Sequence, residues 1–116
     1  MKARLEVNHS TLAEAMGQLV IDLNRRLEKH GRGSFIGSHE IYGVIAEEMD
    51  ELLEAIRGNN LHLVENELMD VAVAALFGYA SLRQIHKWHE SNVALSGPLE
   101  PSKKLGTPNA TNGGGR

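Results

Sequence analysis

Residues 41–79 read IYGVIAEEMDELLEAIRGNNLHLVENELMDVAVAALFGY and contain two helical segments joined by Gly58-Asn59-Asn60. Each residue turns an α-helix by about 100°, so the apolar residues of the first segment fall on one broad face. The second segment is apolar nearly all round over residues 68–82, which is typical of a buried central helix. A short turn makes such segments antiparallel neighbours, and we expect an all-α fold built on this pair.

Acidic residues interrupt the apolar faces of both segments. Glu48 projects into the middle of the first apolar face, and Glu51 lies at its edge. Glu67 and Asp70 share a face with apolar residues of the second segment, and no Lys or Arg lies within one helical turn of them. Burying a carboxylate without a partner costs several kcal/mol or shifts its pKa. These acids therefore need a partner from elsewhere.

The spacing of the acids indicates a divalent cation as that partner. Glu48 and Glu51, like Glu67 and Asp70, are three residues apart and so lie on one helix face. On facing antiparallel helices the two pairs would form a cage of four carboxylates. Mg²⁺ and Mn²⁺ prefer oxygen ligands. The alternative is an ordinary solvated acidic face, because Glu-rich amphipathic helices are common.

The pattern E-E-x-x-E followed by E-x-x-D resembles the all-alpha nucleoside triphosphate pyrophosphohydrolases of the MazG kind. The matching residues are Glu47, Glu48 and Glu51, followed by Glu67 and Asp70. The resemblance implies Mg²⁺-dependent cleavage of a nucleoside triphosphate to the monophosphate and pyrophosphate, with Mn²⁺ able to substitute. It implies that Glu48, Glu51, Glu67 and Asp70 are metal ligands. Glu47 and Glu48 would be catalytic, Glu47 orienting the attacking water or touching a second metal.

The resemblance also bears on assembly and on substrate. It implies a homodimer or tetramer that binds the nucleotide between chains. In that reading each chain supplies three main helices, and dimerisation completes an antiparallel bundle; a domain this small is marginal alone. Residues 39–45 are similar to small phage-borne members. A specialised deoxynucleotide substrate such as dGTP, and a location in the host cytoplasm, are therefore among our expectations.

Candidate substrate contacts come from the helix ends and from the glycine-rich segment 31–37. This segment lacks the G-K-[ST] ending of a P-loop, so a flexible connection is the alternative to a phosphate-binding loop. Under the pyrophosphohydrolase hypothesis we expect it to line the nucleotide pocket, with Phe35 or Ile36 against the base. The candidate cations for the triphosphate include Arg25, Arg26, Lys29, Arg83 and Lys87. The predicted substrate-binding residues are Lys29, Arg32, Phe35, Ile36, His39, Arg83 and Lys87.

The chain divides into a leader at 1–10, a helical domain at 11–92 and a Gly/Pro-containing tail at 93–116. Helix ends are predicted from capping residues. A Thr11/Glu14 capping box starts the first helix and Gly31 stops it. The second helix has Ser38 as its N-cap and Gly58 at its C′ position. Asn60 caps the third helix, which runs to about Trp88 and can bend at Gly78-Tyr79.

Composition excludes several classes of protein. The 116 residues are 41% hydrophobic and 23% charged, which is typical of one small globular domain. A net charge of −3 argues against a nucleic-acid partner, whose binding surface would be basic. The absence of cysteine excludes disulfides and thiol chemistry and fits a cytoplasmic chain. No apolar run approaches the roughly 18–20 residues of a membrane span, so we expect no membrane partner.

A second function class remains open. A non-catalytic helical dimer that acts as an adaptor or regulator explains the apolar stripes, the size and the acidity of the chain. It does not explain acids inside apolar faces. Melting with and without Mg²⁺ or Mn²⁺ separates the two hypotheses, because an ion that binds the native state raises its stability.

Overall fold

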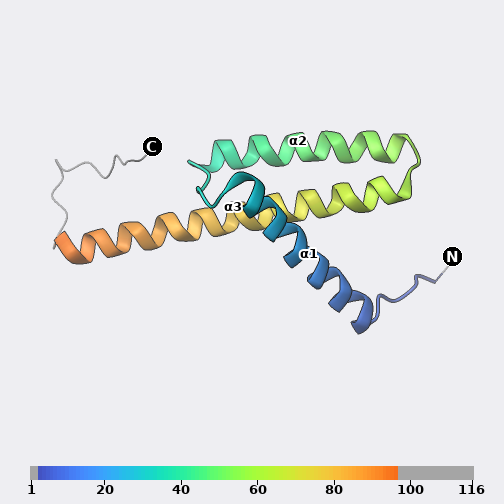
Figure 1. The fold of residues 1–116 in the computed structure, drawn as a ribbon, viewed down its shortest axis with the longest axis horizontal. Coiled ribbons are helices and arrows are strands. Elements are labelled where there is room, and N and C mark those ends of the chain that lie inside the picture. Colours follow the sequence, from blue (N-terminus) through green and yellow to red (C-terminus); the bar gives the residue numbers. More distant parts are fainter. Residues whose placement is uncertain (1–2, 97–116) are drawn as a thin grey trace.

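The computed structural model describes the backbone of residues 3–96 and the side chains of residues 3–92. This part of the chain contains three α-helices and no strand. The helices are α1 (His9–His30), α2 (Ser38–Arg57) and α3 (Leu61–Ser96). Figure 1 shows α2 and α3 running side by side, with α1 crossing α3 obliquely. The prediction of an all-α fold is confirmed.

The turn between α2 and α3 makes the two helices antiparallel. The backbone N–H of Gly58 donates to the carbonyl of Glu54 at 3.0 Å and closes α2. Asn59 takes the left-handed conformation, with φ of 57°, and Asn60 Oδ1 accepts from the Leu63 N–H at 3.2 Å. The predicted Asn60 cap is confirmed. The predicted C′ role of Gly58 is wrong, because Gly58 keeps a helical φ of −80° and Asn59 makes the turn.

The start of α1 differs from the prediction. Asn8 is the N-cap, and its Oδ1 accepts from the Thr11 N–H at 2.9 Å. Thr11 therefore lies inside the first turn, and the predicted Thr11/Glu14 capping box is wrong. The end of α1 is confirmed at Gly31, whose φ is 80° and whose N–H donates to the Leu27 carbonyl at 2.8 Å.

Two other helix ends differ from the prediction. Gly37 rather than Ser38 is the N-cap of α2, and no side chain of residues 3–92 caps this end. Glu40 in the first turn accepts instead from the Ile36 N–H at 2.6 Å. α3 passes through Gly78 without interruption and continues past Trp88 to Ser96, into the residues predicted as tail. The rest of that tail, residues 97–116, and residues 1–2 of the predicted leader lie outside the described residues.

A small core joins α2, α3 and the segment before α2. Its buried apolar residues are Phe35, Leu52, Ala55, Val73, Ala74 and Phe77. The Phe35 N–H donates to the buried hydroxyl oxygen of Ser81 at 3.0 Å. The Phe35 ring packs edge-on against Phe77, with centroids 5.2 Å apart. Phe35 therefore anchors the segment 31–37 to α3.

Gly78 lets α3 approach α2 closely. A Cβ atom at this position would lie 2.9 Å from Cγ2 of Ile41, whose branched side chain has little room to move. We expect Gly78→Val to lower the free energy of unfolding by about 1–3 kcal/mol, because it overpacks this contact. Urea denaturation at fixed protein concentration measures the change.

Gly43 provides the matched control on the neighbouring helix. Within the described part of the chain, a Cβ atom on Gly43 meets nothing within 4 Å, so Gly43→Val should leave stability nearly unchanged or raise it slightly. Equal stabilities of the Gly78→Val and Gly43→Val variants would contradict the close packing of α2 on α3.

Large apolar side chains remain exposed on α1 and α3. No residue of α1 is buried, and Met16 and Val20 are 67% and 57% exposed. Leu61–Asn92 of α3 is long and apolar enough to cross a membrane by length and composition, with a mean hydropathy of 1.2 over its most apolar window. The core helix of a soluble protein meets the same criteria, and α3 carries Glu67 and Asp70. The predicted dimerisation and the predicted absence of a membrane partner both stay predictions.

Candidate metal centre

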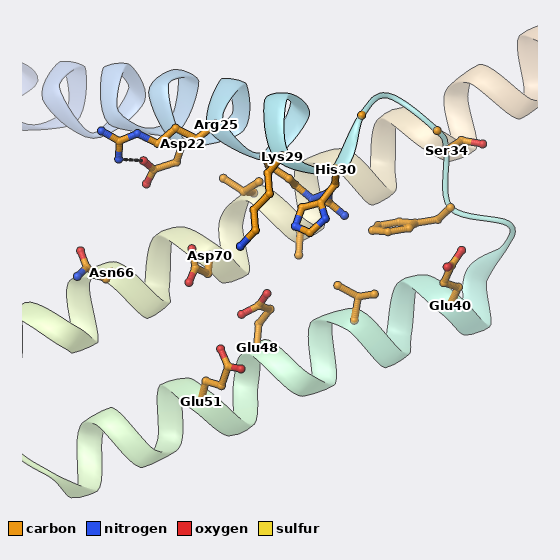
Figure 2. Close-up of a pocket in the computed structure, with 17 residues that line it drawn as sticks. Asp22, Arg25, Lys29, His30, Ser34, Glu40, Glu48, Glu51, Asn66 and Asp70 are labelled. Carbon is orange, nitrogen blue, oxygen red and sulfur yellow. Dashed lines mark hydrogen bonds and ion pairs between the residues drawn. The ribbon is translucent and has the colours of Figure 1, made fainter.

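Four acidic side chains converge between α2 and α3. Glu48 and Glu51 come from α2, and Glu67 and Asp70 come from α3. Each offers a carboxylate oxygen, and these oxygens lie within 4.8 Å of one another. Figure 2 shows Glu48, Glu51 and Asp70 directed into the space between the helices. The structure thus brings together the four acids that the sequence predicts as metal ligands.

The spacing of the helices and of the acids produces this cluster. Each pair is separated by three residues, so both members project from one face of their helix. The tight turn at residues 58–60 keeps α2 and α3 adjacent and antiparallel, and the two acidic faces meet. The cluster lies beside the apolar core, and Glu48 and Glu67 are half-buried.

The four acids have no positively charged partner in the described part of the chain. In the described part of the chain the only ion pair joins Arg25 and Asp22, at 3.3 Å, and involves none of the four acids. Oε2 of Glu67 is buried and has no hydrogen-bond partner among the residues that the structure describes. Buried polar atoms are nearly always paired, and a buried carboxylate oxygen without a donor is costly.

Burial and mutual repulsion make three of these acids, Glu48, Glu67 and Asp70, weaker than usual. Desolvation, followed by the charges of Asp70 and Glu51, raises the pKa of Glu48 from 4.5 to about 7. Burial also raises the pKa of Glu67, with further contributions from Asp70 and Glu51. The pKa of Asp70 is raised by burial first and then by the charges of Asp22 and Glu51. The folded chain therefore holds carboxylates together against their repulsion.

A hard divalent cation fits this donor set. Oxygen ligands lie about 2.0–2.6 Å from Mg²⁺ or Ca²⁺, so two ligands on opposite sides of one ion are about 4–5 Å apart. The 4.8 Å limit on the four oxygens matches that span. A cation would also neutralise the repulsion and satisfy Oε2 of Glu67. The donor set is therefore that of a hard divalent cation, of which Mg²⁺ is one.

A cavity of about 770 Å³ adjoins the cluster and is large enough for a nucleotide. Its wall includes Glu48, Glu51 and Asp70 on the acidic side. The opposite side is the C-terminal half of α1, which contributes the basic residues Arg25, Arg26, Lys29 and His30. Figure 2 shows Lys29 reaching from α1 toward Glu48. The cavity therefore combines a candidate cation site with several side chains suited to an anion.

Only part of the predicted substrate set lies on this cavity. Lys29 and Phe35 line it, but Phe35 is 6% exposed and belongs to the core. Ile36 is 72% exposed and is not part of the lining. The lining also lacks Arg32, His39, Arg83 and Lys87. Glu47 is exposed and lies in neither the acidic cluster nor the cavity wall, so its catalytic role stays a prediction.

The structure adds Asp22 to the site. This side chain lines the cavity from α1 and accepts hydrogen bonds from Gln18 at 3.0 Å and from Arg25 at 3.3 Å. Its charge contributes to the raised pKa of Asp70, so it acts on the cluster across the cavity. Asp22, Arg26 and Lys29 follow at helical spacing on one face of α1. The polar face that these three residues share is the sequence feature that could have indicated α1 as a wall of the cavity.

No family model, curated protein or solved structure matches this chain. The fold and the site define an all-α chain with a candidate carboxylate metal centre. Beside this centre lies a cavity with basic residues on its opposite wall.

Proposed function

We propose that this chain is a divalent-cation-dependent nucleoside triphosphate pyrophosphohydrolase that contributes to control or cleaning of a nucleotide pool. It would add water across the anhydride bond between the α- and β-phosphates, giving a nucleoside monophosphate and pyrophosphate. The observation that carries the proposal is the cluster of four carboxylates on facing helices, to which no cationic side chain of residues 3–92 is paired. The same acids carry the resemblance to MazG-like enzymes.

The cavity supports a phosphate-bearing substrate. A triphosphate has several negative charges, and proteins usually share them between metal ions and two or more basic side chains. Here Lys29 reaches from α1 toward the acidic cluster, and Arg25, Arg26 and His30 line the same cavity. A cavity of about 770 Å³ also leaves room for a base and a sugar.

The chain's own residues would divide the work of the reaction. When bound, Mg²⁺ or Mn²⁺ supplies positive charge to phosphate oxygens and lowers the pKa of a coordinated water. Glu48, Glu51, Glu67 and Asp70 would hold the ion. Side chains of α1 would bind phosphate oxygens and orient the substrate. Glu47 is proposed to orient the attacking water, which requires it to approach the substrate in the bound state.

The enzyme is further proposed to be a homodimer or tetramer. A second copy would cover the exposed apolar side chains of α1, such as Met16 and Val20. A second copy would also complete the helical bundle. Light scattering that gives the mass of a monomer would contradict this part of the proposal.

Product analysis tests the proposed reaction. The full chain is incubated with Mg²⁺ or Mn²⁺ and each common ribo- or deoxyribonucleoside triphosphate, dGTP included, and the nucleotides are separated by chromatography. We expect the monophosphate and pyrophosphate from one or several substrates, and no reaction in excess EDTA.

Other products would change the conclusion. A diphosphate and phosphate would keep the metal site but contradict the bond proposed to break. No turnover with any substrate, together with no metal-dependent change in melting temperature, would contradict the enzyme and favour the helical adaptor.

A further inference from the structure

Arg26 occupies an unusual position on the cavity wall. Its guanidinium carbon lies 4.6 Å from the ring centroid of Phe77 and 5.2 Å from that of Phe35. The side chain is half-buried and lines the same cavity as the acidic cluster. A guanidinium placed over aromatic rings is attracted by their π-electrons. The rings therefore fix where this positive charge lies.

The two rings next to the Arg26 guanidinium, those of Phe35 and Phe77, are themselves held in place by packing. Both rings are buried, with 6% of Phe35 and 9% of Phe77 exposed, and they pack edge to face at 84°. The Phe35 backbone is held by its hydrogen bond to Ser81. A guanidinium carries five N–H donors. Held beside buried aromatic rings on the cavity wall, Arg26 can donate several of them to one ligand in the cavity.

Arg26 lacks an acidic partner in the described part of the chain, where it neither forms an ion pair nor donates a side-chain hydrogen bond. Its neighbour Arg25 differs in both respects, because its side chain is 72% exposed and it pairs with Asp22. Partial burial of a charge without a counter-ion is unfavourable. The cavity beside Arg26 is where an anion would supply that counter-charge.

We propose that Arg26 binds the pyrophosphate portion of the substrate, with its guanidinium donating to oxygens of the two terminal phosphates. This inference rests on the proposed function, from which it takes the substrate class, and it assigns the anion contact to one side chain. Arginine suits the role because its fork donates two parallel hydrogen bonds to a phosphate and keeps its charge at any working pH.

The aromatic support also links anion binding to the segment 31–37. The ring of Phe35 in this segment lies next to the Arg26 guanidinium, and the Phe35 backbone N–H donates to Ser81. A phosphate held by Arg26 would therefore lie against a wall that α1, α3 and this segment build together. In this reading Phe35 supports the phosphate site, and the base lies elsewhere in the cavity.

Binding of inorganic pyrophosphate tests the assignment on the full chain. Calorimetry measures the dissociation constant of pyrophosphate with Mg²⁺ present and with EDTA. We expect Arg26→Met to weaken binding by about 10- to 100-fold in both conditions, because it removes charge-assisted hydrogen bonds. Methionine keeps an unbranched apolar stem on the rings, so the melting temperature should change little. Arg26→Lys should weaken binding by less, because it keeps the charge but loses the fork.

Arg57→Met is the matched control, since Arg57 is exposed and does not line the cavity. It should bind pyrophosphate as the wild-type chain does. Wild-type affinity in Arg26→Met would overturn the proposal, and a lowered melting temperature with that affinity would assign Arg26 to structural support. No pyrophosphate binding by the wild-type chain would overturn it too.

This experiment separates the two proposals. If the wild-type chain turns over nucleoside triphosphates and Arg26→Met still binds pyrophosphate normally, only the proposed role of Arg26 is contradicted. Loss of pyrophosphate binding in that variant, without turnover by the wild-type chain, would contradict the proposed reaction and keep Arg26 as an anion-binding residue.

Discussion

Glu48→Gln is expected to lower turnover of nucleoside triphosphates by about 10³-fold or more while raising the melting temperature of the metal-free protein. Glu48 contributes an oxygen to the acidic cluster, and burial, followed by the charges of Asp70 and Glu51, raises its pKa to about 7. Glutamine has nearly the same shape but no charge, so it weakens the proposed ion site and relieves the repulsion. Loss of activity with a gain in stability is the opposite of what a core defect gives.

Three measurements on one variant test this expectation. Steady-state kinetics gives the turnover, electron paramagnetic resonance gives the affinity for Mn²⁺, and thermal melting in EDTA gives the stability. Relief of about 1 kcal/mol would raise the melting temperature by roughly 4–8 °C for a domain of this size.

Asp50→Asn is the matched control, because it removes one exposed carboxylate of α2 that lies outside the cluster and the cavity. Its kinetics and Mn²⁺ affinity should stay near those of the wild-type chain. A Glu48→Gln variant with normal turnover would exclude the carboxylate cluster as the reaction centre. A variant that melts below the wild type in EDTA would show that repulsion is not the dominant effect at this position.

The parts of the structure that depend on local sequence were predictable. The acidic pairs and the residues of the α2–α3 turn lie close together in the chain, so helical spacing and one turn were enough to place four carboxylates together. The Asn60 cap and the Gly31 stop follow from the same short-range chemistry. Errors at other helix ends arose where two residues compete for one role, as Asn8 and Thr11 do at the start of α1.

The other wall of the site depends on contacts between distant residues. Phe35 meets Ser81 and Phe77, more than forty residues away in the chain, and this contact holds the segment that follows α1 on α3. Sequence spacing does not encode such a contact, so Arg26 and Lys29 were no more prominent than Arg83 and Lys87. The crossing of α1 over α3 places the first two on the cavity. Residues that a second chain would add to that wall are likewise not encoded by spacing, because they depend on how exposed apolar side chains such as Met16 pack between chains.

The metal-free protein is expected to lose stability as the pH rises from about 4.5 to about 7, and a divalent cation should abolish or reverse this loss. The folded pKa of Glu48, about 7, lies above its ordinary value of 4.5. Below about 4.5 the group is protonated in both states and contributes nothing to the difference. Between the two values the folded state binds more protons, so stability falls with rising pH, and above about 7 the full penalty remains.

The size of this loss is on the order of 2 kcal/mol for Glu48 once its partial exposure is allowed for. The pKa values of Glu67 and Asp70 are shifted in the same direction, so both acids add to the loss. A bound cation supplies the positive charge that protons supply at low pH, and it competes with them for the same oxygens. Stabilisation by Mn²⁺ or Mg²⁺ should therefore be small at about pH 5 and large at about pH 8.

Thermal melting at these two pH values, in EDTA and in excess Mn²⁺ at one protein concentration, measures both effects. Glu48→Gln should flatten the pH dependence in EDTA and reduce the Mn²⁺ effect at the higher pH, whereas Asp50→Asn should change neither. A melting temperature in EDTA that rises between the two pH values would contradict the raised pKa values. An Mn²⁺ effect of equal size at both would place the ion away from these carboxylates, because a site made of weak acids must lose affinity when they are protonated.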